Sequence, residues 1–105
     1  MTGRLAIVTG ASGGLGPAIA RRIAEDFDTV LLTDVREERL ETLAAEIEGT
    51  GGARVLAMRC DVSDPAEVAA VYEAAAQEGS ISGLVNAAGI GIYTPLIEIT
   101  PEHWD

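Results

Sequence analysis

The sequence contains no lysine, and its 7 basic residues are all arginines set against 17 acidic residues, for a formal net charge of −10 at pH 7. A chain this acidic is repelled by nucleic acids and by anionic membrane surfaces, which excludes partners bound through basic patches. The missing lysine also excludes the phosphate loop of nucleoside triphosphatases, because that loop requires one. We therefore expect neither a nucleic-acid partner nor a membrane partner.

Cysteine and long apolar runs are equally scarce. Cys60 is the only cysteine, so no internal disulfide can form and nothing indicates an oxidising compartment. No run approaches the ~20 apolar residues of a membrane-spanning helix, and the N-terminus lacks the pattern of a secretion signal. His103 stands without the neighbouring ligands of a metal site, so we expect no metal. Together these absences predict a cytoplasmic protein.

The distribution of apolar residues predicts a single α/β domain over residues 1–105. Runs of strand length alternate with helical patterns and lie at 4–9, 29–34, 53–60 and 82–87. Two helical patterns have apolar residues at i, i+3, i+4 and i+7, namely Leu40, Leu43, Ala44, Ile47 and Val68, Val71, Tyr72, Ala75. Strands rich in valine, isoleucine and leucine are expected to be buried on both faces. Right-handed crossovers then give a doubly wound parallel sheet.

Capping signals mark the ends of the expected helices. Asp64 is followed by proline and, three residues later, by Glu67, which predicts an N-cap, a proline in the first turn and a capping glutamate. The glycines at 49–52 predict the end of the preceding helix, and Gly79 predicts the end of the helix that Asp64 begins. Asp34 and Glu37 have the same capping spacing.

A glycine-rich turn joins the first strand to a helix. Thr9, Gly10, Gly14 and Gly16 fit the pattern T-G-x-x-x-G-x-G, whereas the general G-x-G-x-x-G pattern fails because residue 12 is serine. A helix start offers unpaired N–H groups and the positive end of the helix dipole, and glycine lets a diphosphate approach the backbone closely. The predicted diphosphate contacts are the backbone amides of Ser12, Gly13, Gly14 and Leu15.

This turn and three later motifs resemble the short-chain dehydrogenase/reductase family. An acid, Asp34, closes the second apolar run, Asp61-Val62 follows the third, and Asn86-Ala87-Ala88-Gly89 follows the fourth, where the family usually has Asn-Asn-Ala-Gly. The resemblance implies a Rossmann-type sheet in the order 3-2-1-4 and a nicotinamide dinucleotide cofactor. It also implies hydride transfer between an alcohol and a carbonyl in the complete enzyme.

In that family an acid at the position of Asp34 binds the hydroxyls of the adenosine ribose. The alternative is that Asp34 only caps the second helix. A 2′-phosphate ~4 Å from this carboxylate would be repelled by on the order of 4 kcal/mol at an effective dielectric constant near 20. We therefore expect NAD to be preferred over NADP, with Arg36 acting against that preference.

The remaining motifs imply contacts along the rest of the cofactor. By the resemblance, Asp61 accepts from the adenine amino group and Val62 packs on the ring, although Asp61 could instead serve only as a loop acceptor. Asn86, Ala87, Ala88 and Gly89 would line the ribose on the nicotinamide side. Asn86 also fits a purely structural role at a strand end.

The family's catalytic Tyr-x-x-x-Lys is absent here, since neither Tyr72 nor Tyr93 is followed by a lysine. We therefore expect a cofactor-binding portion truncated before its catalytic half, with no catalytic residue of its own, and the helix-start signal at 100–102 agrees. A non-catalytic dinucleotide-binding module and a Rossmann-like methyltransferase are the alternatives, the latter disfavoured by Thr9 and the Asn86 motif. The fourth strand, left uncovered, predicts a homo-oligomer.

Overall fold

The computed structural model describes residues 3–50 and 52–87, so the expectations for Ala88, Gly89 and the helix start at 100–102 lie outside the described residues. Strands and helices alternate along this part of the chain. The strands are β1 (Arg4–Thr9), β2 (Thr29–Asp34), β3 (Arg54–Arg59) and β4 (Ser80–Asn86), and the helices are α1 (Gly16–Ile23), α2 (Glu37–Glu48) and α3 (Pro65–Glu78).

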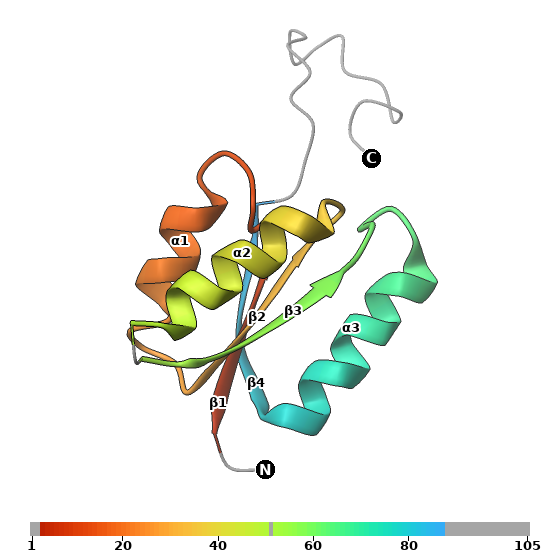
Figure 1. The fold of residues 1–105 in the computed structure, drawn as a ribbon. Helices are drawn as coiled ribbons and strands as arrows, with labels where there is room; N and C mark the ends of the chain where they lie inside the picture. The colour runs from red at the N-terminus through yellow and green to blue at the C-terminus, as the bar shows by residue number, and fades with distance from the viewer. Residues whose placement is uncertain (1–2, 51, 88–105) are drawn as a thin grey trace, which may run out of the picture.

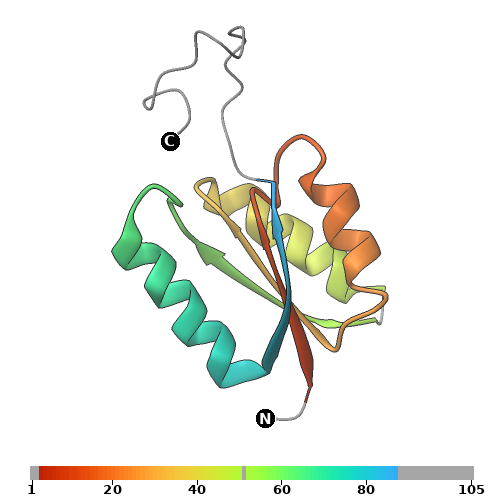
Figure 2. The same ribbon diagram turned by 180° about the vertical axis from the view of Figure 1, so that it is seen from behind.

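The four strands form one parallel sheet in the order β3-β2-β1-β4 (Figure 1). The expected fold class and strand order are therefore confirmed. β1 lies at the centre, with Thr9 opposite Thr33 of β2 on one side and opposite Asn86 of β4 on the other. Because all strands run the same way, their carboxyl ends meet at a single edge of the sheet, as the view from behind also shows (Figure 2).

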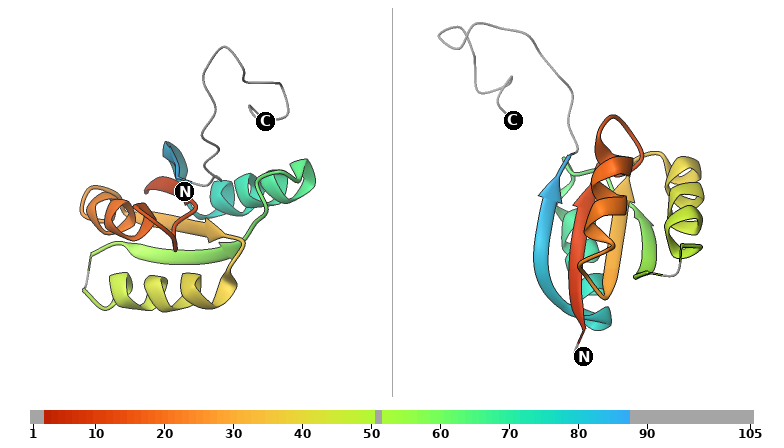
Figure 3. Two further views of the ribbon diagram at one scale, coloured as in Figure 1. Left: turned by 90° about the horizontal axis from the view of Figure 1, so that it is seen from above. Right: turned by 90° about the vertical axis from the view of Figure 1, so that its left-hand side faces the viewer.

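Helices cover both faces of the sheet, α1 and α2 on one side and α3 on the other (Figure 3). Alternate strand residues enter the two cores. Val8, Val30 and Leu32 pack with buried residues of α1 and α2, whereas Leu5, Ile7 and Leu31 pack with Val71 and Ala75 of α3. The central strands thus carry apolar residues at consecutive positions because each face has its own helix layer.

The outer strands depart from the prediction that every strand is buried on both faces. β1 and β2 are almost entirely buried, but β3 alternates between buried and exposed residues and β4 is largely exposed. Leu84 of β4 retains 47% of its surface. β4 pairs with β1 alone, and no element among residues 3–50 and 52–87 covers its outer side. An edge position explains the difference.

The bounds of two strands also differ from those of the apolar runs. β4 begins at Ser80, directly after the C-cap Gly79 of α3, because the Ser80 N–H donates to the Gly3 carbonyl at 2.8 Å and pairing with β1 starts there. The run at 82–87 therefore missed Ser80 and Ile81, the first two residues of this strand. β3 is one residue shorter at each end than the run at 53–60.

The cap of α3 is confirmed at Asp64, whose Oδ1 accepts a hydrogen bond from the Ala66 N–H at 2.9 Å. Glu67 does not complete the expected reciprocal box. The Asp64 N–H already donates to the Asp61 carbonyl at 3.0 Å, so Glu67 Oε1 accepts instead from the Asp61 N–H, also at 3.0 Å. The acid that was expected to cap the helix therefore closes the loop before it. α2 ends at a Gly49 cap, as predicted.

Candidate cofactor site

The carboxyl edge of the sheet brings together the predicted site residues that the structure describes. The glycine turn follows β1, Asp34 ends β2, Asp61 and Val62 follow β3, and Asn86 ends β4 (Figure 1). Backbone bonds join these neighbours directly, from Ala11 N to Thr33 O, Cys60 N to Asp34 O and Ala87 N to Thr9 O, at 3.0–3.1 Å. Residues far apart in the sequence thus lie side by side along the carboxyl edge of the sheet, which we call the carboxyl rim.

The glycines of the turn have separate physical roles. Gly10 and Gly14 have φ angles of 63° and 54°, a region that residues with a Cβ rarely adopt. Gly16 is required by space, because a Cβ there would lie 2.2 Å from the carbonyl oxygen of Gly10 and 2.6 Å from that of Ala11. α1 can therefore start in contact with the end of β1.

Several N–H groups of the turn already have acceptors, while the two directly before α1 remain open. Gly13 N donates to Gly10 O at 3.5 Å, Gly16 N donates to Gly13 O at 2.9 Å, and Ser12 N donates to Asp34. Within the described residues, the N–H groups of Gly14 and Leu15 donate to no protein acceptor. These two donors stand beside the N-terminus of α1, where an anion would satisfy them.

Asp34 is buried at the end of β2 with both carboxylate oxygens engaged. Oδ2 accepts from Ser12 N at 3.2 Å, while Oδ1 accepts from Arg36 N at 3.1 Å and lies 3.6 Å from Arg36 Nε. Burial alone would raise the pKa of this carboxyl, but the hydrogen bonds from Arg36 and Ser12 and the Arg36 charge outweigh it and hold the pKa below its usual value. Asp34 is therefore an anion at neutral pH.

The alternative role of Asp34 as the cap of the second helix is wrong. α2 begins at Glu37, its N-cap is Arg36, and the N-cap side chain makes no capping hydrogen bond. Asp34 lies two residues before this cap, at the end of the strand, and its bond to Arg36 N closes a local turn. The carboxylate of Asp34 therefore bonds to the loop before α2 and not to an N–H group of the helix.

Arg36 reaches from the start of α2 back over the glycine turn. A Cβ on Gly13 would lie 2.3 Å from Arg36 Nη2. The guanidinium therefore packs against the turn at Gly13, where the absence of a side chain leaves room for it. About half of the Arg36 side chain remains exposed. The cation is thus next to Asp34 and open to a ligand, a contact that sequence spacing gave no means of predicting.

Asp61 is fixed in orientation and keeps one oxygen open. Oδ1 accepts from Ser63 N at 2.9 Å and from Ser63 Oγ at 2.6 Å, whereas Oδ2 has no partner within the described part of the chain. The bonds from the Ser63 hydroxyl and N–H hold the pKa of this carboxyl below its usual value. The neighbouring Val62 leaves its apolar side chain about half exposed. An acceptor and an apolar surface therefore stand side by side.

Asn86 bonds to the central strand. Thr9 Oγ1 lies 3.4 Å from both Asn86 Oδ1 and the Val85 carbonyl oxygen, so its hydroxyl can donate to either acceptor. The structural role expected for Asn86 is present, and its amide nitrogen remains available to a further acceptor. The N–H of Ala87 donates to the carbonyl oxygen of Thr9, and this bond places Ala87 at the carboxyl edge of the sheet as well.

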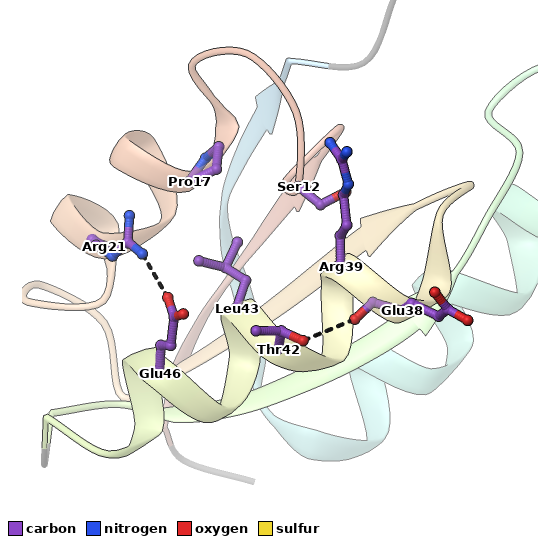
Figure 4. A pocket seen from close by; sticks show the side chains of 8 residues that line it. All are labelled: Ser12, Pro17, Arg21, Glu38, Arg39, Thr42, Leu43 and Glu46. Carbon is purple, nitrogen blue, oxygen red and sulfur yellow. Dashed lines mark hydrogen bonds and ion pairs between the residues drawn. The ribbon is translucent and has the colours of Figure 1, made fainter.

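Two hollows flank the rim. A cavity of about 400 Å³ lies between α1 and α2 below Ser12, with Arg39 at one side and the Arg21–Glu46 ion pair at the other (Figure 4). A second, of about 190 Å³, lies on the α3 face and includes Thr9, Cys60, Tyr72 and Asn86 in its lining. The sequence did not predict the first hollow, because Arg21 and Glu46 lie on different helices.

Cys60, in the lining of the second hollow, has the properties of a packed core residue. Burial raises the pKa of its thiol, which agrees with a packing role.

Within residues 3–50 and 52–87 there is no group of three or more histidine, cysteine, aspartate or glutamate side chains placed to hold a metal ion. No helix in the same ranges is long and apolar enough to cross a membrane.

Comparison with known proteins identifies the family. Residues 4–105 match the family model of the short chain dehydrogenases. The chain belongs to this family. Membership confirms the resemblance drawn from the four motifs and removes the methyltransferase alternative.

Similar dehydrogenases and reductases are longer than this chain. It is 38% identical to (5R,7aS)-5-hydroxy-7a-methyl-1-oxo-2,3,5,6,7,7a-hexahydro-1H-indene-carboxyl-CoA reductase of Mycobacterium tuberculosis, aligning over 100% of this chain and 41% of that protein. It is 40% identical to D-threitol dehydrogenase of Mycolicibacterium smegmatis, over 100% of this chain and 40% of the relative. The structure of L-sorbose reductase from Gluconobacter frateurii, complexed with NADPH and L-sorbose, superposes with a TM-score of 0.80 at 35% identity, covering 98% of this chain and 40% of that one. The chain thus spans about two fifths of these relatives.

Proposed function

We propose that this chain is the dinucleotide-binding portion of an oxidoreductase that moves hydride between a small alcohol and its carbonyl, with NAD as the preferred cofactor. The observation that carries the proposal is the carboxyl rim, where open N–H donors, a buried anion and an acceptor beside an apolar side chain follow one another over three neighbouring strands. A dinucleotide presents a diphosphate, a ribose diol and an adenine in that succession.

Each part of the rim fits one part of the cofactor. The Gly14 and Leu15 N–H groups, at the start of α1, would bind the diphosphate. Asp34 would accept from the ribose hydroxyls, and Asp61 Oδ2 would accept from the adenine amino group while Val62 packs on the ring. Asn86 and Ala87, with Ala88 and Gly89 from the sequence motif, would line the ribose beside the nicotinamide.

The preference for NAD rests on the charge of Asp34. Its lowered pKa keeps the carboxylate charged at neutral pH, and its bonds hold it in place, so a 2′-phosphate would meet a fixed negative charge. Arg36 acts in the other direction, because its exposed guanidinium lies next to the same carboxylate. The NADPH in the L-sorbose reductase structure shows that this fold also accepts the phosphorylated cofactor. The balance at Asp34 and Arg36 sets the preference.

The cofactor supplies the hydride chemistry, and the residues described here bind and orient it. Proton transfer at the substrate oxygen needs a positioned acid or base. The sequence has no Tyr-x-x-x-Lys for that step, so the whole reaction depends on groups beyond those named here.

Calorimetric titration of the chain with NAD+ and NADP+ tests the proposal. We expect tighter binding of NAD+, and we expect Asp34→Ser to narrow the difference because it removes the repelling charge. Asp61→Asn is the matched control, since the adenine is common to both cofactors and this change should weaken them equally. Equal affinity of the unchanged chain for both cofactors would contradict the assignment of Asp34, and binding of neither would contradict the proposed function.

A further inference from the structure

We propose that Asp34 is also a positioning residue, whose carboxylate fixes the glycine turn in its binding shape before any cofactor arrives. This inference rests on the proposed function, because it concerns the turn that would bind the diphosphate. It assigns Asp34 a second task that is separate from contact with the ribose.

The carboxylate extends the pairing of β1 with β2 beyond its last backbone bond. The ladder between these strands ends with Thr9 opposite Thr33, after which Ala11 N donates to Thr33 O at 3.1 Å. The next N–H along the turn, that of Ser12, donates to Asp34 Oδ2 at 3.2 Å. A side chain therefore supplies the acceptor at the point where the diverging backbone no longer can.

This bond is well placed to fix the turn. Ser12 and Asp34 are 9% and 6% exposed, and a hydrogen bond from an N–H to a buried carboxylate is stronger than one between neutral groups. The second oxygen is held by Arg36 N and Arg36 Nε, so the carboxylate cannot rotate freely away from Ser12. The acceptor is therefore fixed as well as charged.

The turn is also tied by the bonds from Ala11 N to Thr33 O and from Gly16 N to Gly13 O, but no backbone–backbone hydrogen bond within the described residues holds Ser12 itself. Gly10 and Gly14 add conformational freedom to the unanchored chain, and the Gly13 N–H reaches Gly10 O only at 3.5 Å. Loss of the Ser12 bond would release the stretch before Gly14 and Leu15, the residues with open N–H donors. Binding of a diphosphate would then have to order the turn, which lowers affinity.

Each carboxylate oxygen offers about two acceptor sites, so the two tasks are compatible. A ribose hydroxyl can donate to Asp34 while Ser12 and Arg36 keep their bonds. The positioning task should therefore be measurable with a ligand that has no ribose hydroxyls.

The test compares ADP with 2′,3′-dideoxy-ADP, which keeps the adenine and diphosphate but lacks both hydroxyls. Both are titrated by NMR into the chain, Asp34→Asn and the control Asp28→Asn. The control also removes a carboxylate that accepts a backbone N–H, from Arg4 at 2.8 Å, but at the amino end of the sheet. We expect Asp34→Asn to weaken the binding of dideoxy-ADP about tenfold, the effect of replacing a charge-assisted bond by a weaker neutral one, and Asp28→Asn to leave it unchanged. Unchanged dideoxy-ADP binding in Asp34→Asn, with weakened ADP binding, would confine Asp34 to the ribose and overturn the inference.

A measurement without ligand separates this inference from the proposed function. The Ser12 amide proton shift should follow the titration of the Asp34 carboxyl as the pH is lowered, together with that of Arg36, and this dependence should vanish in Asp34→Asn. A Ser12 shift that ignores the Asp34 titration would overturn the inference even if cofactor binds. Failure of the unchanged chain to bind ADP would overturn the proposed function and leave the amide titration to decide the positioning role.

Discussion

Gly16, the first residue of α1, lies against the carbonyl oxygen of Gly10, so closely that a Cβ on Gly16 would come within 2.2 Å of it. This contact places the open N–H groups of the turn at the rim of the sheet, because the helix starts directly beside the strand that precedes it. Gly14, two residues earlier, has a φ of +54°, and a Cβ added there would meet no atom of the described residues within 4 Å. The two positions require glycine for different reasons.

Gly16→Ala should therefore cost more than Gly14→Ala. At Gly16 backbone atoms must move, with an expected loss of about 3 kcal/mol of unfolding free energy. At Gly14 only the left-handed conformation is penalised, by about 1 kcal/mol. Urea unfolding measures both values. Gly14→Asn is the control, since asparagine tolerates this conformation and should recover part of the loss. Equal losses at Gly14 and Gly16 would contradict the close contact.

The free energy of unfolding should fall in acid, partly because Asp34 becomes protonated. Its pKa is lowered in the folded chain, so its contribution is complete above the unfolded value of about 4 and is lost as the pH falls through the lower folded value. Asp34→Asn should be less stable than the unchanged chain at pH 7, and the difference should shrink below about pH 4. Urea unfolding at a series of pH values gives this comparison. A difference that stays constant down to acid unfolding would show that the Asp34 charge contributes nothing.

The sequence predicted the sheet and its central strands because the signals there are local and redundant. Val30 to Leu32 are apolar at consecutive positions, as expected for a strand between two helix layers, and the structure buries them all. The composition of β4 resembles that of the inner strands, so its residues alone indicate burial, and the expectation that it is left uncovered came from the family resemblance. Exposure of Leu84 depends on whether another element lies beside it, which the residues of the strand do not encode.

The candidate site was predictable in its members but not in its connections. The residues near Gly10, Asp34, Asp61 and Asn86 were identified from motifs, each of which lies in a short stretch of sequence. The bond from Ser12 to Asp34 spans 22 residues and joins a backbone group to a side chain, so no spacing rule reveals it. The capping spacing of Asp34 was misleading for the same reason, since its partners are set by the adjoining strand as much as by the helix that follows.

The N-cap of α3 gives a prediction independent of any ligand. Asp64 accepts from Ala66 N, so Asp64→Ala leaves a helix donor unpaired and should cost about 1 kcal/mol of unfolding free energy. Glu73→Ala, at an exposed position within the same helix, is the control and should change stability little. Urea unfolding of the two variants tests the assignment. A larger loss in Glu73→Ala than in Asp64→Ala would be inconsistent with the cap.

The chain by itself should turn over neither alcohols nor ketones. Among the described residues, Tyr72 is the one tyrosine that could act as an acid or base. It lies on α3, in the lining of the second hollow, and it is followed by Glu-Ala-Ala-Ala where the family motif has x-x-x-Lys. The absorbance of reduced nicotinamide, followed with a panel of small alcohols and ketones, should stay constant. Turnover that disappears in Tyr72→Phe would show that this tyrosine acts as an acid or base.

The last prediction concerns self-association through β4. This strand pairs with β1 alone within the described residues, and Leu84 and Ile81 are 47% and 38% exposed. Unpaired strand edges and exposed apolar side chains both favour contact with a second copy. The net charge of −10 opposes contact, but salt screens this repulsion beyond ~8 Å at physiological ionic strength. We therefore expect a dimer or larger assembly that strengthens as salt is raised.

Sedimentation at two salt concentrations, with one variant and one control, decides the matter. Leu84→Arg places a charge on the exposed strand and should weaken association about tenfold, the effect of burying an uncompensated charge at ~1.4 kcal/mol or more. Val35→Arg is the matched control, because Val35 is 50% exposed but lies after β2, away from β4. It should leave association nearly unchanged, because Val35 lies away from β4, and it controls for net charge because both variants alter that charge equally. Equal weakening by the two would show that the effect is not specific to β4, since the added arginine reduces the repulsion between copies in both variants. A monomer at micromolar concentration in both salts would show that the β4 edge does not drive assembly.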